Sequence, residues 1–249
     1  MTRDEIEEDV SVGLDAESKL VAIPGTNYRM GQTPVTQRLY EKVMGENPSY
    51  FQLSNDDFDD DEREALGRNT ANNPVETVSW FDAVYFCNKL SMKEGLTPAY
   101  SVDGETDPEY WGYTPHEGGE IESEVECDFD SDGYRLPTND EWEEAANGGG
   151  SYTYSGSDDL DEVGWYNGNS DYVTHPVAQK MANDYGLHDM SGNVCEWVWD
   201  SVQDIPAGRY FRGGSYGSFA GYCEVSYLCN GGADYQNGGI GFRLLRPMD

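Results

Sequence analysis

Residues 209–247 read RYFRGGSYGSFAGYCEVSYLCNGGADYQNGGIGFRLLRP, and two short motifs frame most of this run. Arg212-Gly213-Gly214-Ser215 stands near its start and Gly241-Phe242-Arg243 near its end. Between the motifs Tyr, Gly, Ser and Asn predominate, as they do in an antibody paratope, where Tyr supplies rigid contact area and the smaller residues adapt. This composition predicts a binding surface. The alternative is a glycine-rich surface loop or a tail with little order.

Length and composition indicate one folded domain. The chain has 249 residues, and 13% of them are aromatic, which argues against global disorder. The 29 Gly and 11 Pro predict many turns and loops. We expect an acidic N-terminal segment at residues 1–20 and a single domain over residues 21–249. The framed region then forms a cassette at residues 209–243 of that domain.

The charge of the chain narrows the class of partner. There are 48 acidic and 15 basic residues, so the formal net charge is −33. Such a surface repels nucleic-acid phosphates and anionic lipids. It suits high salt or bound cations, or it is simply a solvated acidic face. The sequence shows no signal peptide or long apolar run, so we expect no membrane insertion.

Three helices are predicted in the first part of the chain. One covers Thr36 to Val43 and another Ser79 to Glu94, and a third starts at a Thr138/Glu141 capping box. A short strand and turn are expected over residues 21–31. Residues 54–73 and the acidic insertion at 103–133 read as loops. After Gly148-Gly149-Gly150 no helix is predicted, only short aromatic runs.

Five sequence blocks, in order, carry a resemblance to the formylglycine-generating-enzyme or sulfatase-modifying-factor family, over about residues 21–247. The resemblance implies an α+β, C-type-lectin-like fold of this subtype, with few short helices, small twisted sheets and much irregular backbone. Function must still be argued from the site, because one fold hosts several chemistries. The blocks are PVTQRLYEKVMGENPSYF (34–51), NPVETVSWFDAVYFCNKLSMKEGLTPAY (73–100), GYRLPTNDEWEEAANGG (133–149), YGLHDMSGNVCEWVWD (185–200) and RYFRGGSY…GFRLLRP (209–247).

The residues that the family uses for catalysis are incomplete here. Its oxygen-dependent, copper-using enzymes carry two cysteines five residues apart, of which the second matches Cys223 and the first falls on Ser218. A hydroxyl is a poor substitute for a soft-metal thiolate, so the resemblance implies no such enzyme and leaves Cys223 as a packing residue. The alternative is a divergent metal- and thiol-dependent oxidase. An iron-binding branch needs clustered histidines, and His116, His175 and His188 show no such spacing.

The cassette resembles that of a third branch, the variable proteins of diversity-generating retroelements. There, error-prone reverse transcription rewrites Asn codons of the AAY type. The outcomes include Gly, Ser, Tyr, Phe, Asp, Cys, Leu and Asn, but not Lys, Glu, Gln, Met or Trp. Glu224 and Gln236 break this rule and align with positions that are not rewritten. The positions that align as variable all obey it: Tyr216, Gly217, Ser218, Phe219, Gly221, Tyr222, Tyr227, Cys229, Asn230, Gly231, Gly232, Asp234, Tyr235, Asn237, Gly238 and Gly239.

The same alignment predicts which side chains face outward. Frame residues are expected to be anchored in the scaffold, while the variable side chains point to solvent, with the aromatic ones as anchors for a ligand. A core position could not exchange Gly, Tyr and Asp without cavities or overpacking. The predicted fixed positions are Arg212, Gly213, Gly214, Cys223, Gly241, Phe242 and Arg243, and the predicted aromatic anchors are Tyr216, Phe219, Tyr222, Tyr227 and Tyr235.

Two sequence patterns raise the question of a metal. In enzymes of the family a calcium ion is held near the G-N-V-x-E-W block, and Asn193 and Glu196 match its side-chain ligands. The alternative is that both side chains hydrogen-bond a tight turn. Asp128, Asp130 and Asp132 match the opening of a calcium-binding EF-hand loop, but the ligand at its twelfth position is missing, so a solvated acidic turn is preferred.

The leading hypothesis is therefore a binding protein that catalyses no reaction, requires no cofactor and has calcium as a possible ligand. Its expected partner is a protein or glycan on another cell or virion, and its expected location is a cell surface or virion. It would act as a monomer or as part of a larger surface or virion assembly. A purely structural surface or virion component is a further alternative.

Overall fold

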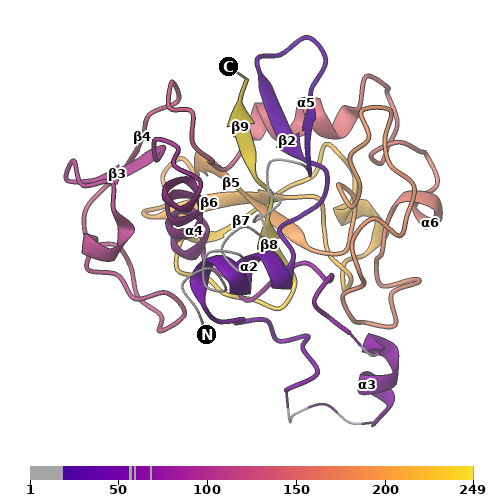
Figure 1. Ribbon diagram of the computed structural model, residues 1–249. Coiled ribbons are helices and arrows are strands. Elements are labelled where there is room, and N and C mark those ends of the chain that lie inside the picture. The colour runs from indigo at the N-terminus through magenta and orange to yellow at the C-terminus, as the bar shows by residue number, and fades with distance from the viewer. Residues whose placement is uncertain (1–18, 56–57, 59, 68, 249) are drawn as a thin grey trace, which may run out of the picture.

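The three predicted helices are confirmed, and each begins at a capping residue (Figure 1). The computed structural model describes residues 19–55, 58, 60–67 and 69–248, so the acidic segment up to residue 18 lies outside it. α2 (Gln37–Met44) follows the N-cap Thr36, while α4 (Trp80–Lys93) follows Ser79 and α5 (Asn139–Asn147) follows Thr138. The last two helices carry full capping boxes, in which an acidic residue accepts from the backbone N–H of the cap.

Three helical segments contradict the sequence prediction. The expected loop over 54–73 contains α3 (Asp60–Leu66), and the region after residue 150 contains the four-residue α6 (Leu160–Val163) and the 3-10 turn η3 (Ala220–Tyr222). α6 is stabilised by tertiary burial, because Leu160 and Val163 pack against Cys223. A helix of one turn is too short to show a hydrophobic period.

The acidic insertion is also more ordered than the predicted loop. Within it, η2 (Pro108–Tyr110) is followed by β4 (Val125–Cys127), which pairs antiparallel with β3 (Tyr100–Val102). Trp111 and Ile121 are buried in the main core cluster. The insertion therefore folds back on the domain through its few apolar residues, while its acidic residues remain at the surface.

Small sheets complete the α+β fold, as predicted. β1 (Leu20–Ala22), β2 (Tyr28–Gly31) and β9 (Leu245–Pro247) form a three-stranded sheet that joins the two ends of the domain. A four-stranded sheet has the order β7 (Leu228–Gly232), β6 (Gly208–Arg212), β5 (Cys195–Ser201) and β8 (Ile240–Phe242). β8 runs parallel to β5 and the other pairs are antiparallel.

The core lies on both faces of β5, which runs through the middle of the molecule between α4 and α5 (Figure 1). Neighbouring residues of a strand face opposite sides, so Trp197 joins the cluster built on α2 and α4 while Val198 joins the cluster built on α5. The buried indole of Trp197 keeps its hydrogen bond, since its Nε1 donates to Val78 O at 2.9 Å. No helix among the described residues is long and apolar enough to cross a bilayer.

A buried ion pair joins the parts of this core. Arg243, fully buried directly after β8, donates from Nη2 to Glu196 Oε1 at 2.8 Å and from Nε to Oε2 at 3.0 Å. Its remaining donors reach Gly31 O and His188 O, both at 2.7 Å. Trp142 Nε1 of α5 donates to the same carboxylate at 2.7 Å. The ion pair between Arg243 and Glu196 therefore connects β8 and β9 with β5, α5 and β2.

Replacing Arg243 with Met is expected to lower the free energy of unfolding by about 3–5 kcal/mol, because Glu196 would be left buried without its counter-ion. Chemical denaturation measures this loss. As a control, replacing the exposed Lys93 with Met should change the free energy by less than about 0.5 kcal/mol. A loss below about 1 kcal/mol for Arg243→Met would show that the ion pair does not hold the core together.

Candidate ligand-binding surface

The cassette enters and leaves through strands of the four-stranded sheet. β6 lies inside the sheet, between β5 and β7, and β8 pairs with β5 on its other side. Residues 213–227 connect β6 to β7, and residues 233–239 connect β7 to β8. β7 is an edge strand, so one of its sides is unpaired within this sheet. Both ends of the cassette are therefore held in the core, whereas its middle lies at the rim.

Arg212 anchors the first connection to α5. It is buried, its Nε donates to Asn139 Oδ1 at 2.8 Å, and its Nη2 forms an ion pair with Glu143. Its Nη1 also donates to the carbonyl oxygens of Val225 at 2.9 Å and Tyr227 at 3.2 Å. The guanidinium of Arg212 thus holds the end of this connection that leads into β7 against α5.

Two glycines of the frame have no room for a side chain. A Cβ on Gly214, whose φ is 70°, would lie 2.6 Å from Cys223 Sγ. A Cβ on Gly241 would lie 2.3 Å from the carbonyl oxygen of Val75. Both positions require glycine because neighbouring atoms leave no room for a Cβ. Gly214 is also required because its backbone is left-handed.

Gln236 anchors the second connection. Its Nε2 donates to Asp82 Oδ2 at 3.0 Å, at the N-terminus of α4. Burial acts to raise the pKa of Asp82, but hydrogen bonds from His116, Ser79 and Tyr113 hold it below its usual value, so the carboxylate stays an acceptor. Gln236 is a residue that the codon pattern excludes from variation, and this contact is a structural reason for keeping it. The sequence did not predict its partner.

Exposure separates the two predicted classes of position. All seven fixed positions are buried. Of the sixteen predicted variable positions, fifteen are exposed or half-buried, and Gly239 alone is buried. The predicted fixed positions thus lie in the core, and nearly all predicted variable positions reach the surface.

Seven of the sixteen predicted variable positions line an open depression of about 680 Å³. Tyr222 and Tyr227 stand edge to face on one wall, with ring centroids 4.9 Å apart. Phe219 lies 6.4 Å from Tyr222 and is 68% exposed. Tyr235 lines the depression too, so aromatic rings dominate a wet, accessible surface. Its lining residues are Cys195, Phe211, Gly214, Ser215, Ser218, Tyr222, Tyr227, Cys229, Tyr235, Asn237, Gly239 and Ile240.

Tyr216 is not the exposed anchor that the sequence predicted. Its ring meets Phe51 edge to face at 4.8 Å, within the small cluster that also holds Phe58 and Leu66. Burial raises its pKa to about 12. Ser170 Oγ donates to its carbonyl oxygen at 2.7 Å. This position links the cassette to the 51–66 segment, a contact between distant segments that residue type alone could not reveal.

The two positions of the family's cysteine pair offer no reactive thiolate. Cys223 is fully buried beside Leu160 and Val163, and burial raises its pKa to about 12. Ser218 accepts a hydrogen bond from Ser215 N at 2.9 Å and so shapes the turn. Two further thiols, of Cys195 and Cys229, line the depression, and burial raises the pKa of both. The sequence did not predict that these two lie together.

The sequence profile of the sulfatase-modifying factor enzyme 1-like domain matches residues 9–248 of this chain. The chain belongs to this family. The predicted family and fold are therefore confirmed.

Proteins similar to this chain carry different names. A protein of Paenibacillus barcinonensis named chaperone protein LppX is 37% identical, over 89% of this chain and 80% of its own length. The mouse inactive C-alpha-formylglycine-generating enzyme 2 is 25% identical, over 94% and 87%. The solved structure of Treponema denticola variable protein 1 has a TM-score of 0.77 at 35% identity, and the match covers 92% of this chain and 91% of that one.

The residues that match the family's calcium ligands do not fit a calcium ion here. Both oxygens of Glu196 are taken by Arg243, and one of them also by Trp142. Asn193 Oδ1 accepts from His175 N at 3.1 Å, and its amide donates to His175 O at 3.0 Å. A carboxylate neutralised by a buried guanidinium is not free to ligate a cation. In this structure Asn193 hydrogen-bonds the backbone of His175 and Glu196 pairs with Arg243.

The other candidate ligands each have separate partners. His116 contacts Tyr40, His175 stacks on Trp165 and His188 bonds Lys180 O. In the acidic turn, Asp128 Oδ1 accepts from Asp130 N, and Asp132 Oδ1 accepts from Thr97 N. Among the residues that the structure describes, no group of three His, Cys, Asp or Glu side chains is arranged to hold a metal.

A buried carboxylate, that of Glu76, lies next to the connection between β7 and β8. The sequence did not predict it. Glu76 accepts hydrogen bonds from Tyr50 N and Phe51 N, both at 2.9 Å, and from Thr77 Oγ1 at 2.8 Å. A Cβ on Gly238 would lie 3.7 Å from it. Burial raises its pKa from 4.5 to about 7, and the hydrogen bonds offset this only in part.

Glu76 should make stability depend on pH. Its pKa is higher in the folded chain, so its contribution is greatest below pH 4.5 and falls until the pH passes about 7. Between about pH 5 and pH 8 the loss should be about 2–3 kcal/mol. The measurement is denaturation of the wild type and Glu76→Gln across this range. The variant should lack this decline, and parallel profiles would show that Glu76 is already ionised in the folded protein at pH 5.

Proposed function

We propose that this chain is the variable protein of a diversity-generating retroelement, and that residues 216–239 of its cassette form a ligand-binding surface. The observation that carries the proposal is the agreement between codon rule and burial. Residues that the codon rule permits line the exposed surface, whereas the frame residues and Gln236 hold the scaffold. The likeness to Treponema denticola variable protein 1 supports the same class.

The location of the variable positions explains how they could change without unfolding the domain. They lie on an edge strand and two surface connections whose ends are anchored by Arg212, Gln236 and Arg243. Substitution at an exposed position leaves no cavity and forces no overpacking. Gly239 and Tyr216 are the two positions where we expect the least freedom.

The chemistry of the surface suits a protein or glycan ligand on another cell or virion. Phe219, Tyr222, Tyr227 and Tyr235 present large, rigid rings, and such residues commonly supply most of the energy of an interface. Within a chain of net charge −33, only Glu224 and Asp234 are charged between Gly213 and Gly241. The surface is therefore less repulsive than the rest of the protein. We place it on a cell surface or virion, as a monomer or within a larger assembly.

The alternative function, a metal- and thiol-dependent oxidase, has less support. It would need Cys223 as a thiolate, but this thiol is fully buried and its pKa is raised to about 12. The family also contains a relative named as inactive. We therefore propose that the chain catalyses no reaction and requires no cofactor.

The DNA around the gene tests the proposed class. We expect a reverse-transcriptase gene together with a near-copy of the segment that encodes residues 209–243. The two copies should differ at adenines of the template, and the differences should fall in codons of the sixteen variable positions. Sequencing the same locus in several isolates would show this directly. An isolated gene without a second copy, or differences spread evenly over all codons, would contradict the proposal.

A further inference from the structure

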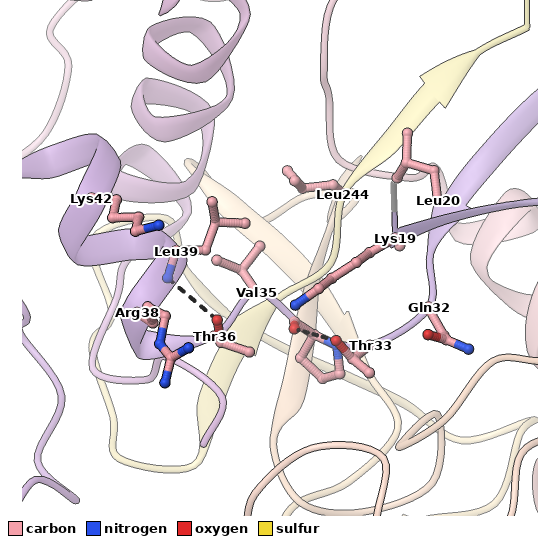
Figure 2. Close-up of a pocket in the computed structure, with 12 residues that line it drawn as sticks. Lys19, Leu20, Gln32, Thr33, Val35, Thr36, Arg38, Leu39, Lys42 and Leu244 are labelled. Carbon is pink, nitrogen blue, oxygen red and sulfur yellow. Dashed lines mark hydrogen bonds between the residues drawn. The ribbon is translucent and has the colours of Figure 1, made fainter. Parts of the chain in front are cut away.

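A second pocket, separate from the cassette, gathers positive charge. It encloses about 710 Å³ of open space between β1, the segment that follows β2, α2 and Leu244. It shares no lining residue with the cassette depression. Figure 2 shows Lys19 on one side of it, and Arg38 and Lys42 of α2 on the other. We call it the basic pocket.

Cations are scarce in this chain, with only 15 Lys and Arg residues against 48 Asp and Glu. Lys89, Arg135, Arg212 and Arg243 each form an ion pair with a carboxylate. Lys19, Arg38 and Lys42 are exposed and form no ion pair with any residue that the structure describes. Three of the chain's few cations thus line one pocket.

The wall between these cations is apolar. Val35 and Leu39 lie between Lys19 and the two cations of α2 in Figure 2, and Leu20 and Leu244 line the same pocket. The backbone donors at the start of α2 are already used, since Gln37 N donates to Asn73 O and Arg38 N to Ala71 O. The positive character of the pocket therefore comes from its side chains.

We propose that the basic pocket binds a small amphipathic anion, namely a carboxylate or phosphate that carries an apolar tail. The anionic head would lie among Lys19, Arg38 and Lys42, and the tail against Val35 and Leu39. A long acidic chain or an anionic membrane would bring many charges into the field of a protein with net charge −33, whereas a small ligand brings one or two. The proposal does not depend on the function of the cassette.

Calorimetric titration of the full chain with octanoate tests this proposal. We expect a Kd below about 1 mM, and at least about tenfold weaker binding of the neutral octanamide and of butyrate. The variant Lys19→Gln/Lys42→Gln should bind octanoate at least about tenfold more weakly. The variant Lys89→Gln/Lys93→Gln loses the same charge outside the pocket, so it should stay within about twofold of the wild type.

Four results would overturn the proposal. They are no octanoate binding up to about 10 mM, equal binding of octanamide, equal loss in the two double variants, and unchanged affinity in Lys19→Gln/Lys42→Gln. A competition experiment tests whether the chain's own N-terminal segment binds in the basic pocket instead. A synthetic peptide of residues 4–17, which is rich in Asp and Glu, should not displace octanoate at matched concentration. Displacement by this peptide would make the chain's own N-terminal segment the ligand and would also refute the proposal.

Discussion

The ion pair between Arg243 and Glu196 is the contact on which the rest of the domain depends. It is fully buried and joins the end of the cassette to β5, while Trp142 binds the same carboxylate from α5. A buried charge is costly unless each of its hydrogen-bonding groups is matched. This requirement constrains the positions of neighbouring segments, because Gly31 O and His188 O must also accept hydrogen bonds from the guanidinium.

This constraint lets the surface be both anchored and changeable. Arg212 holds the first connection to α5, Gln236 holds the second to the capped start of α4, and Arg243 holds the strand that follows. The exposed residues of these connections, such as Tyr222 and Tyr235, contribute little to the core, whereas Cys223, Val225 and Ala233 belong to it. Tyr222 and Tyr235 can then serve recognition, because the stability of the domain comes from elsewhere.

Local signals in the sequence predicted much of this structure. The caps at Thr36, Ser79 and Thr138 define three helices through short-range chemistry, and the ordered blocks predicted the family and its fold. What the sequence could not predict depends on distant partners. Neither the burial of Tyr216 against Phe51, nor that of α6 against the core, nor the ion pair of Glu196 with Arg243 follows from residue type.

Saturation mutagenesis of residues 209–243, with selection of displayed variants for protease resistance, tests whether a buried frame holds a surface that can change. We expect exposed variable positions such as Tyr222, Tyr227 and Tyr235 to accept most residues with changes within about 0.5 kcal/mol. The seven fixed positions, and Gln236, should reject nearly all substitutions. Uniform tolerance along the cassette, or unfolding when the three tyrosines become Ala together, would contradict the division into an anchored frame and a changeable surface.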